Sequence, residues 1–337
     1  LDRSNLQDWT GLLNKKIAMM NHTHLIVFTT RHPWIVEVVN EVKPEEFEVA
    51  FLDMSDEAQA QDLLPKADFL VCIKLSRAHA KLLTRCKLVM HNGVGYDAID
   101  QQAMAEMGIP LAVTPAMTPE GVSEHALMMM LSLYKQAPAV RRSMLSGEWD
   151  MFGWRQNSHN LSYKTVGIVG LGRIGKRLAR LLHAFDCTLL YNDIVEMPAE
   201  LEACYQLRRV EFETLLAESD IVTLHVPLTE LTGGMMGAKE FGMMKEGAVF
   251  INTCRGETYE MDALYEALTS GHLYGAGLDV FDPEPAKLEH PLFQMPNVVF
   301  SPHIASGTVE RQYGINRAQF ANAQRVLDGL EPNDLVS

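Results

Sequence analysis

The sequence predicts an α/β fold built from two doubly wound parallel sheets, each in a domain of its own. Short apolar runs alternate with polar, helix-compatible stretches, which is the pattern of parallel βαβ units. This alternation occurs twice along the chain and is interrupted once, by a long helical segment. The length of 337 residues also favours two domains, because a domain commonly holds about 150 residues.

Four predicted strands open the first domain. A polar stretch follows each apolar run, so the strands should be parallel and joined by helical crossovers. The runs are His24–Thr29, Phe47–Leu52, Phe69–Ile73 and Leu88–Met90. They predict a smaller, flavodoxin-like domain that starts at residue 23. Residues 1–22 show no period, and we take them as an extension or added sequence outside both domains.

A long helix is predicted between the two runs of strands, at Val122–Ser146. Its first half is apolar on nearly every side, which indicates burial against a large surface. Pro138 should kink this helix, because proline lacks the amide proton of a helical hydrogen bond. Two interpretations stay open: a core helix between the domains and a subunit interface.

The strand pattern restarts, more regularly, in the second half of the chain. Six strands with helical stretches between the first five indicate a larger doubly wound domain over residues 119–305. The strands are Thr165–Val169, Thr188–Asn192, Ile221–Val226, Ala248–Thr253, Tyr274–Val280 and Val298–Ser301. A last helical stretch, Asn316–Leu327, belongs to neither run. We expect it to return to the smaller domain, which would then comprise residues 23–118 plus 306–337.

The larger domain opens with a glycine-rich turn of the form G-x-G-x-x-G, set between a strand and a helix. In that context the motif indicates a Rossmann fold that binds a dinucleotide. Gly170 allows the tight turn, Gly172 lets the backbone approach the pyrophosphate, and Gly175 lets helix and strand pack closely. The amides of Arg173 and Ile174, at a positive helix end, should hold the phosphates.

Asp193 follows the next predicted strand, 18 residues after Gly175. A carboxylate in this place accepts hydrogen bonds from the adenosine ribose and repels a 2′-phosphate. The residues next to Asp193 are Asn192, Ile194 and Val195, and none of them is an arginine or lysine that could bind a 2′-phosphate. The competing interpretation is a loop aspartate that binds no ligand. The cofactor is predicted to be NAD rather than NADP.

Charge and cysteine content exclude several classes of partner. The net charge of -14 argues against nucleic acid or an anionic membrane, because either would be repelled over most of the surface. The five cysteines are scattered, odd in number and without a CxxC pair. This pattern favours a reduced, cytoplasmic protein over a disulfide scaffold or a metal site.

Three polar residues follow later strands of the larger domain, where open α/β sheets bind ligands. They are Arg255, Glu284 and His303, spaced 29 and 19 residues apart. Each alone has an ordinary structural explanation, such as a surface ion pair or a structural histidine. Their coincidence around one cofactor fold points to an active site.

With these motifs in order, the chain resembles the D-isomer-specific 2-hydroxyacid dehydrogenases. The resemblance covers nearly everything from His24 to Leu335 and implies a homodimer that interlocks from Val122 onward. The motifs that carry it are His91–Asp100, the glycine turn, His225–Thr229, Asn252–Gly256, Asp279–Phe281 with Glu284–Pro285, and Ser301–Ala305.

The chemistry of such an enzyme asks for these residue types. Reduction of a 2-keto acid needs a hydride from nicotinamide and a proton for the carbonyl oxygen. His303 is the predicted general acid/base, and Glu284 would fix its tautomer and favour its protonated form. Arg255 would bind the substrate carboxylate and polarise the keto oxygen.

The resemblance also implies further contacts around substrate and cofactor. The backbone amides of Val94 and Gly95, in the smaller, substrate-binding domain, would complete the carboxylate site. Lys74 is a candidate for binding a second anionic group, and a solvated lysine is the competing interpretation. The implied cofactor contacts are His225, Val226, Pro227, Thr253, Cys254 and Asp279, the last of which would orient the nicotinamide amide. For the first three, packing at the end of a strand is the competing interpretation.

Three alternatives share parts of this pattern. Formate dehydrogenases have the architecture but lack the glutamate that stands here as Glu284. Phosphonate dehydrogenases place a lysine in the loop where this chain has Asn92 and Val94. Corepressors that resemble the C-terminal-binding proteins keep the triad as NAD-sensing scaffolds, but no disordered extension or basic run supports that interpretation here.

Overall fold

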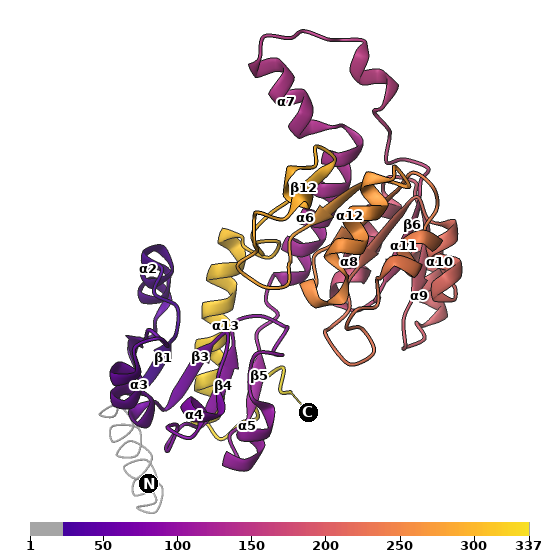
Figure 1. The fold of residues 1–337 in the computed structure, drawn as a ribbon. Coiled ribbons are helices and arrows are strands. Elements are labelled where there is room, and N and C mark those ends of the chain that lie inside the picture. Colours follow the sequence, from indigo (N-terminus) through magenta and orange to yellow (C-terminus); the bar gives the residue numbers. More distant parts are fainter. Residues whose placement is uncertain (1–22, 337) are drawn as a thin grey trace, which may run out of the picture. The chain divides into compact units, whose positions relative to one another are not determined.

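A computed structural model describes residues 23–336 of the chain. The prediction for residues 1–22 lies outside the described residues. Two compact units can be distinguished. One contains the described residues up to Met117 together with those from Thr308 onward, and the other is Thr118–Gly307. Figure 1 gives the labels of helices and strands used below.

The smaller unit is a five-stranded parallel sheet with helices along the chain between its strands. The strand order is β2-β1-β3-β4-β5, which is the flavodoxin-like order. The strands are β1 His24–Phe28, β2 Phe47–Phe51, β3 Phe69–Cys72, β4 Leu88–His91 and β5 Leu111–Val113. The helices are α2 Pro33–Val42, α3 Glu57–Leu63, α4 Arg77–Ala80, α5 Gln101–Met107 and α13 Val309–Leu327.

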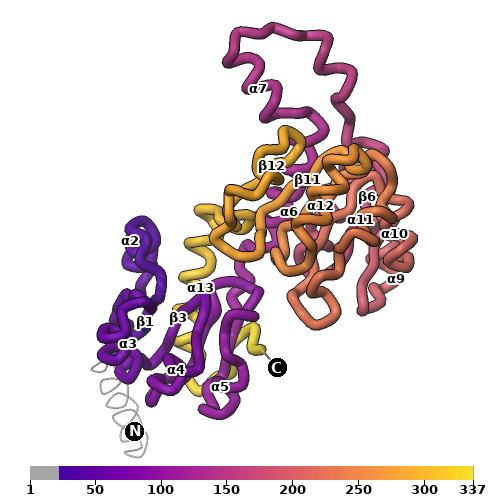
Figure 2. The backbone as a smooth tube through the Cα atoms, viewed as in Figure 1, coloured from indigo at the N-terminus to yellow at the C-terminus, as the bar shows by residue number. Residues whose placement is uncertain are grey.

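The C-terminal helix α13 supplies part of the core of this smaller unit. Phe320 packs its ring against Phe28 and Phe47, with ring centroids 6.0 and 5.6 Å apart. In Figure 2 the yellow end of the chain runs beside the indigo and purple strands. The helix starts at Val309, seven residues before the predicted Asn316, because Thr308 caps it by accepting from the amide of Arg311.

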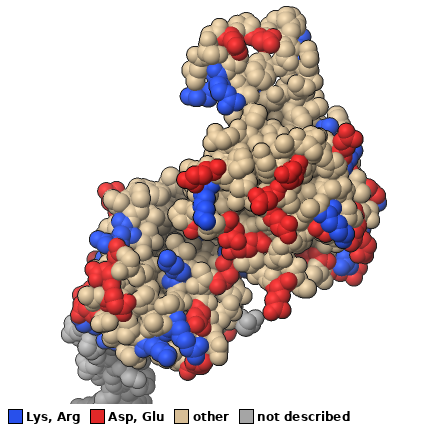
Figure 3. Space-filling view, in the orientation of Figure 1, with Lys and Arg blue, Asp and Glu red and all other residues tan. Residues whose placement is uncertain are grey.

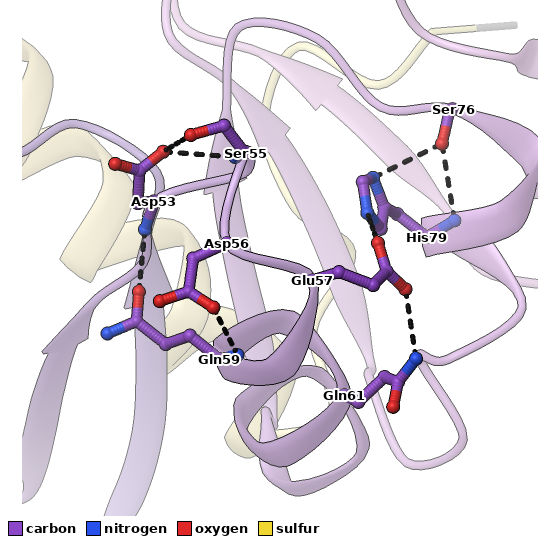
Figure 4. Close-up of polar contacts among 8 residues, drawn as sticks. All are labelled: Asp53, Ser55, Asp56, Glu57, Gln59, Gln61, Ser76 and His79. Atoms are coloured by element: carbon purple, nitrogen blue, oxygen red, sulfur yellow. Dashed lines mark hydrogen bonds and ion pairs between the residues drawn. The ribbon is translucent and has the colours of Figure 1, made fainter.

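Two short helices of this unit, α3 and α4, are each capped by the residue that precedes them (Figure 4). Asp56 caps α3 by accepting from the Gln59 amide at 3.0 Å, and Ser76 caps α4 by accepting from the His79 amide at 3.3 Å. The His79 ring also lies 3.2 Å from the carboxylate of Glu57. This contact ties α4 to α3, so the loop after β3 has a defined course.

The larger unit is a seven-stranded parallel sheet with helices between its strands. Its order is β12-β11-β10-β9-β6-β7-β8, a Rossmann arrangement with one additional strand. The strands are β6 Thr165–Val169, β7 Thr188–Asn192, β8 Leu207–Arg209, β9 Ile221–Leu224, β10 Ala248–Asn252, β11 Leu273–Leu278 and β12 Val298–Phe300. The helices are α6 Thr118–Tyr134, α7 Ala137–Leu145, α8 Arg173–His183, α9 Ala199–Tyr205, α10 Phe212–Glu218, α11 Ala238–Met243 and α12 Met261–Thr269.

The predicted single helix at Val122–Ser146 is two helices, so that prediction was wrong. Gln136 has a φ of +50°, in the left-handed region, and ends the first helix before the second begins. Pro138 lies in the first turn of α7, where its missing amide proton costs no helical hydrogen bond. Figure 1 shows α7 and the segment after it extending away from the large sheet.

One side of α6 belongs to the core of the larger unit. Two glycines of β11 let the helix approach this strand closely. A Cβ at Gly277 would lie 2.9 Å from the Cβ of Met129, and one at Gly275 would lie 3.1 Å from Leu133 Cδ2. The other side of the helix is partly open, and Met128 there is 44% exposed.

Candidate active site and cofactor site

The three predicted catalytic residues follow three neighbouring strands of the large sheet. Arg255 comes after β10, Glu284 after β11 and His303 after β12, and these strands lie side by side. Parallel strands end at the same edge of a sheet, and open α/β sheets bind ligands beyond that edge.

Glu284 and His303 form a hydrogen-bonded pair. Nδ1 of His303 lies 2.8 Å from Oε2 of Glu284, and the other carboxylate oxygen accepts from the amide of Phe281 at 3.1 Å. Both side chains remain open to solvent, with 46% of His303 and 38% of Glu284 exposed. Within the described residues, Nε2 of His303 has no hydrogen-bond partner, so this nitrogen can face a substrate.

The loop that carries Arg255 is pinned to its neighbours. The Arg255 carbonyl accepts from Asn252 Nδ2 at 3.0 Å and from the Thr258 hydroxyl at 2.7 Å. At Gly256 an added Cβ would lie 2.0 Å from the backbone carbon of Phe281. Only glycine permits this approach, which brings the arginine loop against the loop that leads to Glu284.

Asp279, at the end of β11, is fully buried. Its Oδ1 accepts from the Ser301 hydroxyl at 2.5 Å and from the Ile304 amide at 2.9 Å, and its Oδ2 accepts from the Ala305 amide at 2.7 Å. The described contacts of this carboxylate are thus with the loop around His303 and with His125 on α6, whose Nε2 lies 3.8 Å from Oδ1. Its predicted contact with the nicotinamide amide stays a prediction.

The glycine turn has the backbone that a pyrophosphate requires. Gly170 has a φ of +89°, and an added Cβ there would lie 2.6 Å from the carbonyl oxygen of His225. A Cβ at Gly175 would lie 2.2 Å from the Gly170 carbonyl, whereas at Gly172 it would meet nothing within 4 Å. Helix α8 starts directly afterwards at Arg173, and no side chain of the described residues caps it. Its first amides, including that of Ile174, therefore suit an anion.

Asp193 stands beside this turn and accepts from the amide of Leu171 at 2.6 Å. A second residue beside Asp193, Arg209, was not indicated by the sequence. Arg209, on β8, donates to the carbonyl of Asp193 at 3.1 Å and lies 3.9 Å from the carboxylate of Glu196. A basic side chain thus reaches the loop after Asp193 from the adjoining strand, although none occurs next to Asp193 in the sequence.

Two buried polar atoms near the same sheet edge lack partners among the described residues, namely Nδ1 of His225 and the hydroxyl of Thr253. Buried polar atoms are nearly always hydrogen-bonded in a complete structure. Together with the open glycine turn, they fit a bound dinucleotide. Val226 and Pro227 follow His225 in the same loop, and Cys254 follows Thr253. Burial raises the pKa of the Cys254 thiol, so it is not a reactive thiolate.

The predicted substrate-binding residues of the smaller unit occupy its strand ends. The loop with Val94 and Gly95 follows β4, and Lys74 follows β3 as an exposed side chain. Helix α13 holds this loop through Asn92. The side-chain oxygen of Asn92 accepts from Gln319 Nε2 at 3.3 Å, and the Asn92 carbonyl accepts from the Arg311 guanidinium at 3.1 Å. The role of Lys74 in binding a second anionic group stays a prediction.

No group of three or more metal-ligating side chains is present among the described residues. No helix of the described part is long and apolar enough to cross a membrane. In Figure 3 acidic side chains are spread over the larger unit, and the visible face carries no continuous basic surface there.

Comparison with known proteins identifies the larger unit. Residues 127–305 match the D-isomer specific 2-hydroxyacid dehydrogenase, NAD binding domain. Glyoxylate reductase of Thermococcus litoralis is 36% identical over 280 residues, which are 81% of this chain and 84% of that protein. Formate dehydrogenase of Arabidopsis thaliana is 37% identical over 227 residues, covering 67% of this chain and 59% of that protein.

The fold comparison agrees. The crystal structure of Rhodotorula graminis D-mandelate dehydrogenase superimposes with a TM-score of 0.83 at 26% identity, covering 94% of this chain and 98% of that one. These findings confirm the predicted fold class, the assignment as an enzyme and NAD as the cofactor. They favour the enzyme over the corepressor alternative. On its sequence, its two parallel sheets and its glycine turn, the chain belongs to the D-isomer-specific 2-hydroxyacid dehydrogenase family.

Proposed function

We propose that the protein reduces a small 2-keto acid to the 2-hydroxy acid with NADH, and catalyses the reverse reaction, with His303 as general acid/base. The observation that carries this proposal is the hydrogen bond between His303 and Glu284 beside the loop of Arg255. The bound cofactor supplies or accepts the hydride. The side chains of this chain must bind the acid and move one proton.

The hydrogen bond between Glu284 and His303 determines which nitrogen of His303 exchanges a proton with the substrate. A carboxylate only accepts, so Glu284 takes the hydrogen bond from Nδ1–H of His303. Nε2 is therefore the atom that exchanges a proton with the substrate oxygen. In reduction it donates to the carbonyl oxygen, and in oxidation it accepts the hydroxyl proton.

Arg255 is proposed to bind the substrate. A guanidinium offers a planar fork of donors that matches a carboxylate and can also polarise the adjacent keto oxygen. The pinned carbonyl of Arg255 fixes where this side chain starts. The amides of Val94 and Gly95 are proposed as additional donors to the carboxylate, and Lys74 as a donor to a second anionic group.

The substrate is proposed to be a small 2-keto acid because one relative is named glyoxylate reductase. Formate oxidation, suggested by the relative named formate dehydrogenase, releases no proton from oxygen and needs no general base. The exposed Glu284–His303 pair therefore favours the keto acid.

The test follows the absorbance of NADH with glyoxylate, hydroxypyruvate, pyruvate, 3-phosphohydroxypyruvate and 2-ketoglutarate, and separately with formate and NAD⁺. We expect turnover of at least one keto acid and none of formate. His303→Ala should lower kcat by about 100-fold or more, with little change in NADH binding. Turnover of formate alone, or a fully active His303→Ala variant, would contradict the proposal.

We further propose a homodimer located in the cytoplasm. The arm formed by α7 and the segment up to Phe152 exposes apolar side chains, with Leu145, Trp149 and Phe152 each more than 60% exposed. A shallow groove at the start of this arm is lined by Leu127, Met128 and Leu131. Exposed apolar surface of this kind commonly marks a protein interface. All five cysteines are free thiols, as suits a reducing compartment.

A further inference from the structure

His125, on α6, makes a hydrogen bond that the proposed chemistry does not use. Its Nε2 lies 2.8 Å from the hydroxyl oxygen of Ser301, which in turn lies 2.5 Å from Oδ1 of Asp279. A carboxylate only accepts, so the single hydroxyl proton of Ser301 goes to Asp279. The Ser301 oxygen must therefore accept the Nε2 proton of His125. The directions of the two hydrogen bonds that link His125, Ser301 and Asp279 are thereby fixed.

This series of hydrogen bonds continues from Asp279 to the backbone of the loop that carries His303. The carbonyl of Asp279 accepts from the amide of His303 at 2.7 Å. Its carboxylate accepts from the amides of Ile304 at 2.9 Å and Ala305 at 2.7 Å. Three consecutive amides around the proposed general acid thus donate to one buried residue, and Ser301 and His125 hold the side chain of that residue.

His303 needs such support because its backbone is strained. Its φ of +53° lies in the left-handed region, which a residue with a Cβ rarely adopts. A strained residue of this kind persists only where the surrounding contacts determine its conformation. Here the hydrogen bonds to Asp279 are such contacts, so whatever orients Asp279 also orients His303.

Helix α6 is placed to act as the scaffold for this loop. Gly121 lies one turn before His125, and an added Cβ there would be 3.2 Å from the carbonyl oxygen of Ala305. Met129 and Leu133 continue the same row of the helix and pack on β11. His125 is the polar member of a row that otherwise contacts the sheet through apolar or absent side chains, and only 14% of its side chain is exposed.

We propose that His125 is a positioning residue for the reaction. Through Ser301 and Asp279 it holds the loop that carries His303, and so fixes the place from which the proton is delivered. The proposal rests on the proposed role of His303. It predicts a loss in the chemical step, whereas a histidine that only packs α6 would affect stability.

The test compares His125→Leu, which removes the donor, with His125→Gln, whose amide nitrogen can still donate to Ser301. For keto acid reduction we expect kcat of the leucine variant to fall by about tenfold, while its KM and the Kd of NADH stay within about twofold. The glutamine variant should recover most of kcat. His183→Gln, on α8 and outside this chain of contacts, is the control and should retain full activity.

Ser301→Ala tests the coupling without altering α6. If His125 acts through Ser301, the double variant His125→Leu/Ser301→Ala should be no slower than the slower single variant. Losses that multiply would overturn the proposal, as would full kcat in His125→Leu or equal losses in the leucine and glutamine variants. An active His303→Ala variant would instead contradict the proposed function. An inactive His303→Ala beside a fully active His125→Leu would contradict this inference alone.

Discussion

At the scale of single residues, the carboxylate of Glu284 is the group whose removal tests the acid/base pair. Glu284→Gln keeps the shape of the side chain but removes its charge beside His303. Reduction needs a protonated imidazole and oxidation a neutral one. Loss of the negative charge favours the neutral ring, so the alkaline limit of reduction should move to lower pH. The measurement is kcat/KM against pH in both directions. Unchanged profiles would mean that Glu284 is structural.

Cofactor choice depends on a second carboxylate, that of Asp193. The unmodified enzyme should prefer NADH over NADPH by about tenfold or more in kcat/KM, since Asp193 repels a 2′-phosphate. Asp193→Ala should narrow this gap. The guanidinium of Arg209 lies at the same loop, so Asp193→Ala/Arg209→Ala should lose part of the gained NADPH activity. Equal use of both cofactors by the unmodified enzyme would contradict the assignment.

His225 links the cofactor loop to stability at acidic pH. Burial lowers its pKa to about 4 in the folded protein, below the ordinary value of about 6.5. The unfolded chain therefore binds an additional proton between these values, and stability is lost as the pH falls from about 6.5 toward 4. The Tm of His225→Gln should fall less steeply over this interval. Parallel Tm profiles for the variant and the unmodified protein would show that His225 does not titrate in this way.

At the scale of elements, hydrophobic runs predicted most of the two sheets. The predicted runs of four and six strands coincide with observed strands, and β6 and β7 have the expected bounds. The strands that sequence reasoning missed, β5 and β8, have three residues each. Leu207-Arg208-Arg209 contains a single apolar residue, so no apolar run marks β8 in the sequence.

The missed strand β8 had a consequence for the site. Because Leu207–Arg209 was not assigned to the sheet, Arg209 could not be placed beside Asp193.

The break between α6 and α7 was missed for a different reason. Sequence reasoning placed a kink at Pro138, but the chain turns at Gln136 in a left-handed conformation, which no local signal for glutamine indicates.

The positions of Arg255, Glu284 and His303 could be predicted because strand ends meet at one edge of a parallel sheet. The contact of His125 with Ser301 could not, because it joins residues 176 positions apart. No periodicity or motif relates a helix residue to a loop at that separation. Only the packing of α6 on β11 brings the two together.

At the scale of the whole molecule, the apolar arm predicts the oligomeric state. Burial of an arm with Trp149 79% exposed and Leu145 71% exposed in a partner should stabilise a dimer. Leu145→Glu/Trp149→Glu places two charges there and should shift the mass measured by light scattering from dimer toward monomer. Leu231→Glu, at a residue also 79% exposed but on a different loop, is the control. A monomeric unmodified protein would contradict the proposed dimer.

The return of α13 to the smaller sheet has a consequence for synthesis on the ribosome. The strands β1–β5 are made early, but Phe320, which packs on Phe28 and Phe47, is translated only after the whole of Thr118–Gly307. At roughly 5–20 residues per second, that interval lasts about 10 to 40 s. During it the nascent sheet has an uncovered aromatic face, which is the kind of surface that chaperones bind. The larger unit, which is continuous in sequence, can complete its own core while the first-made sheet is still waiting for its last helix.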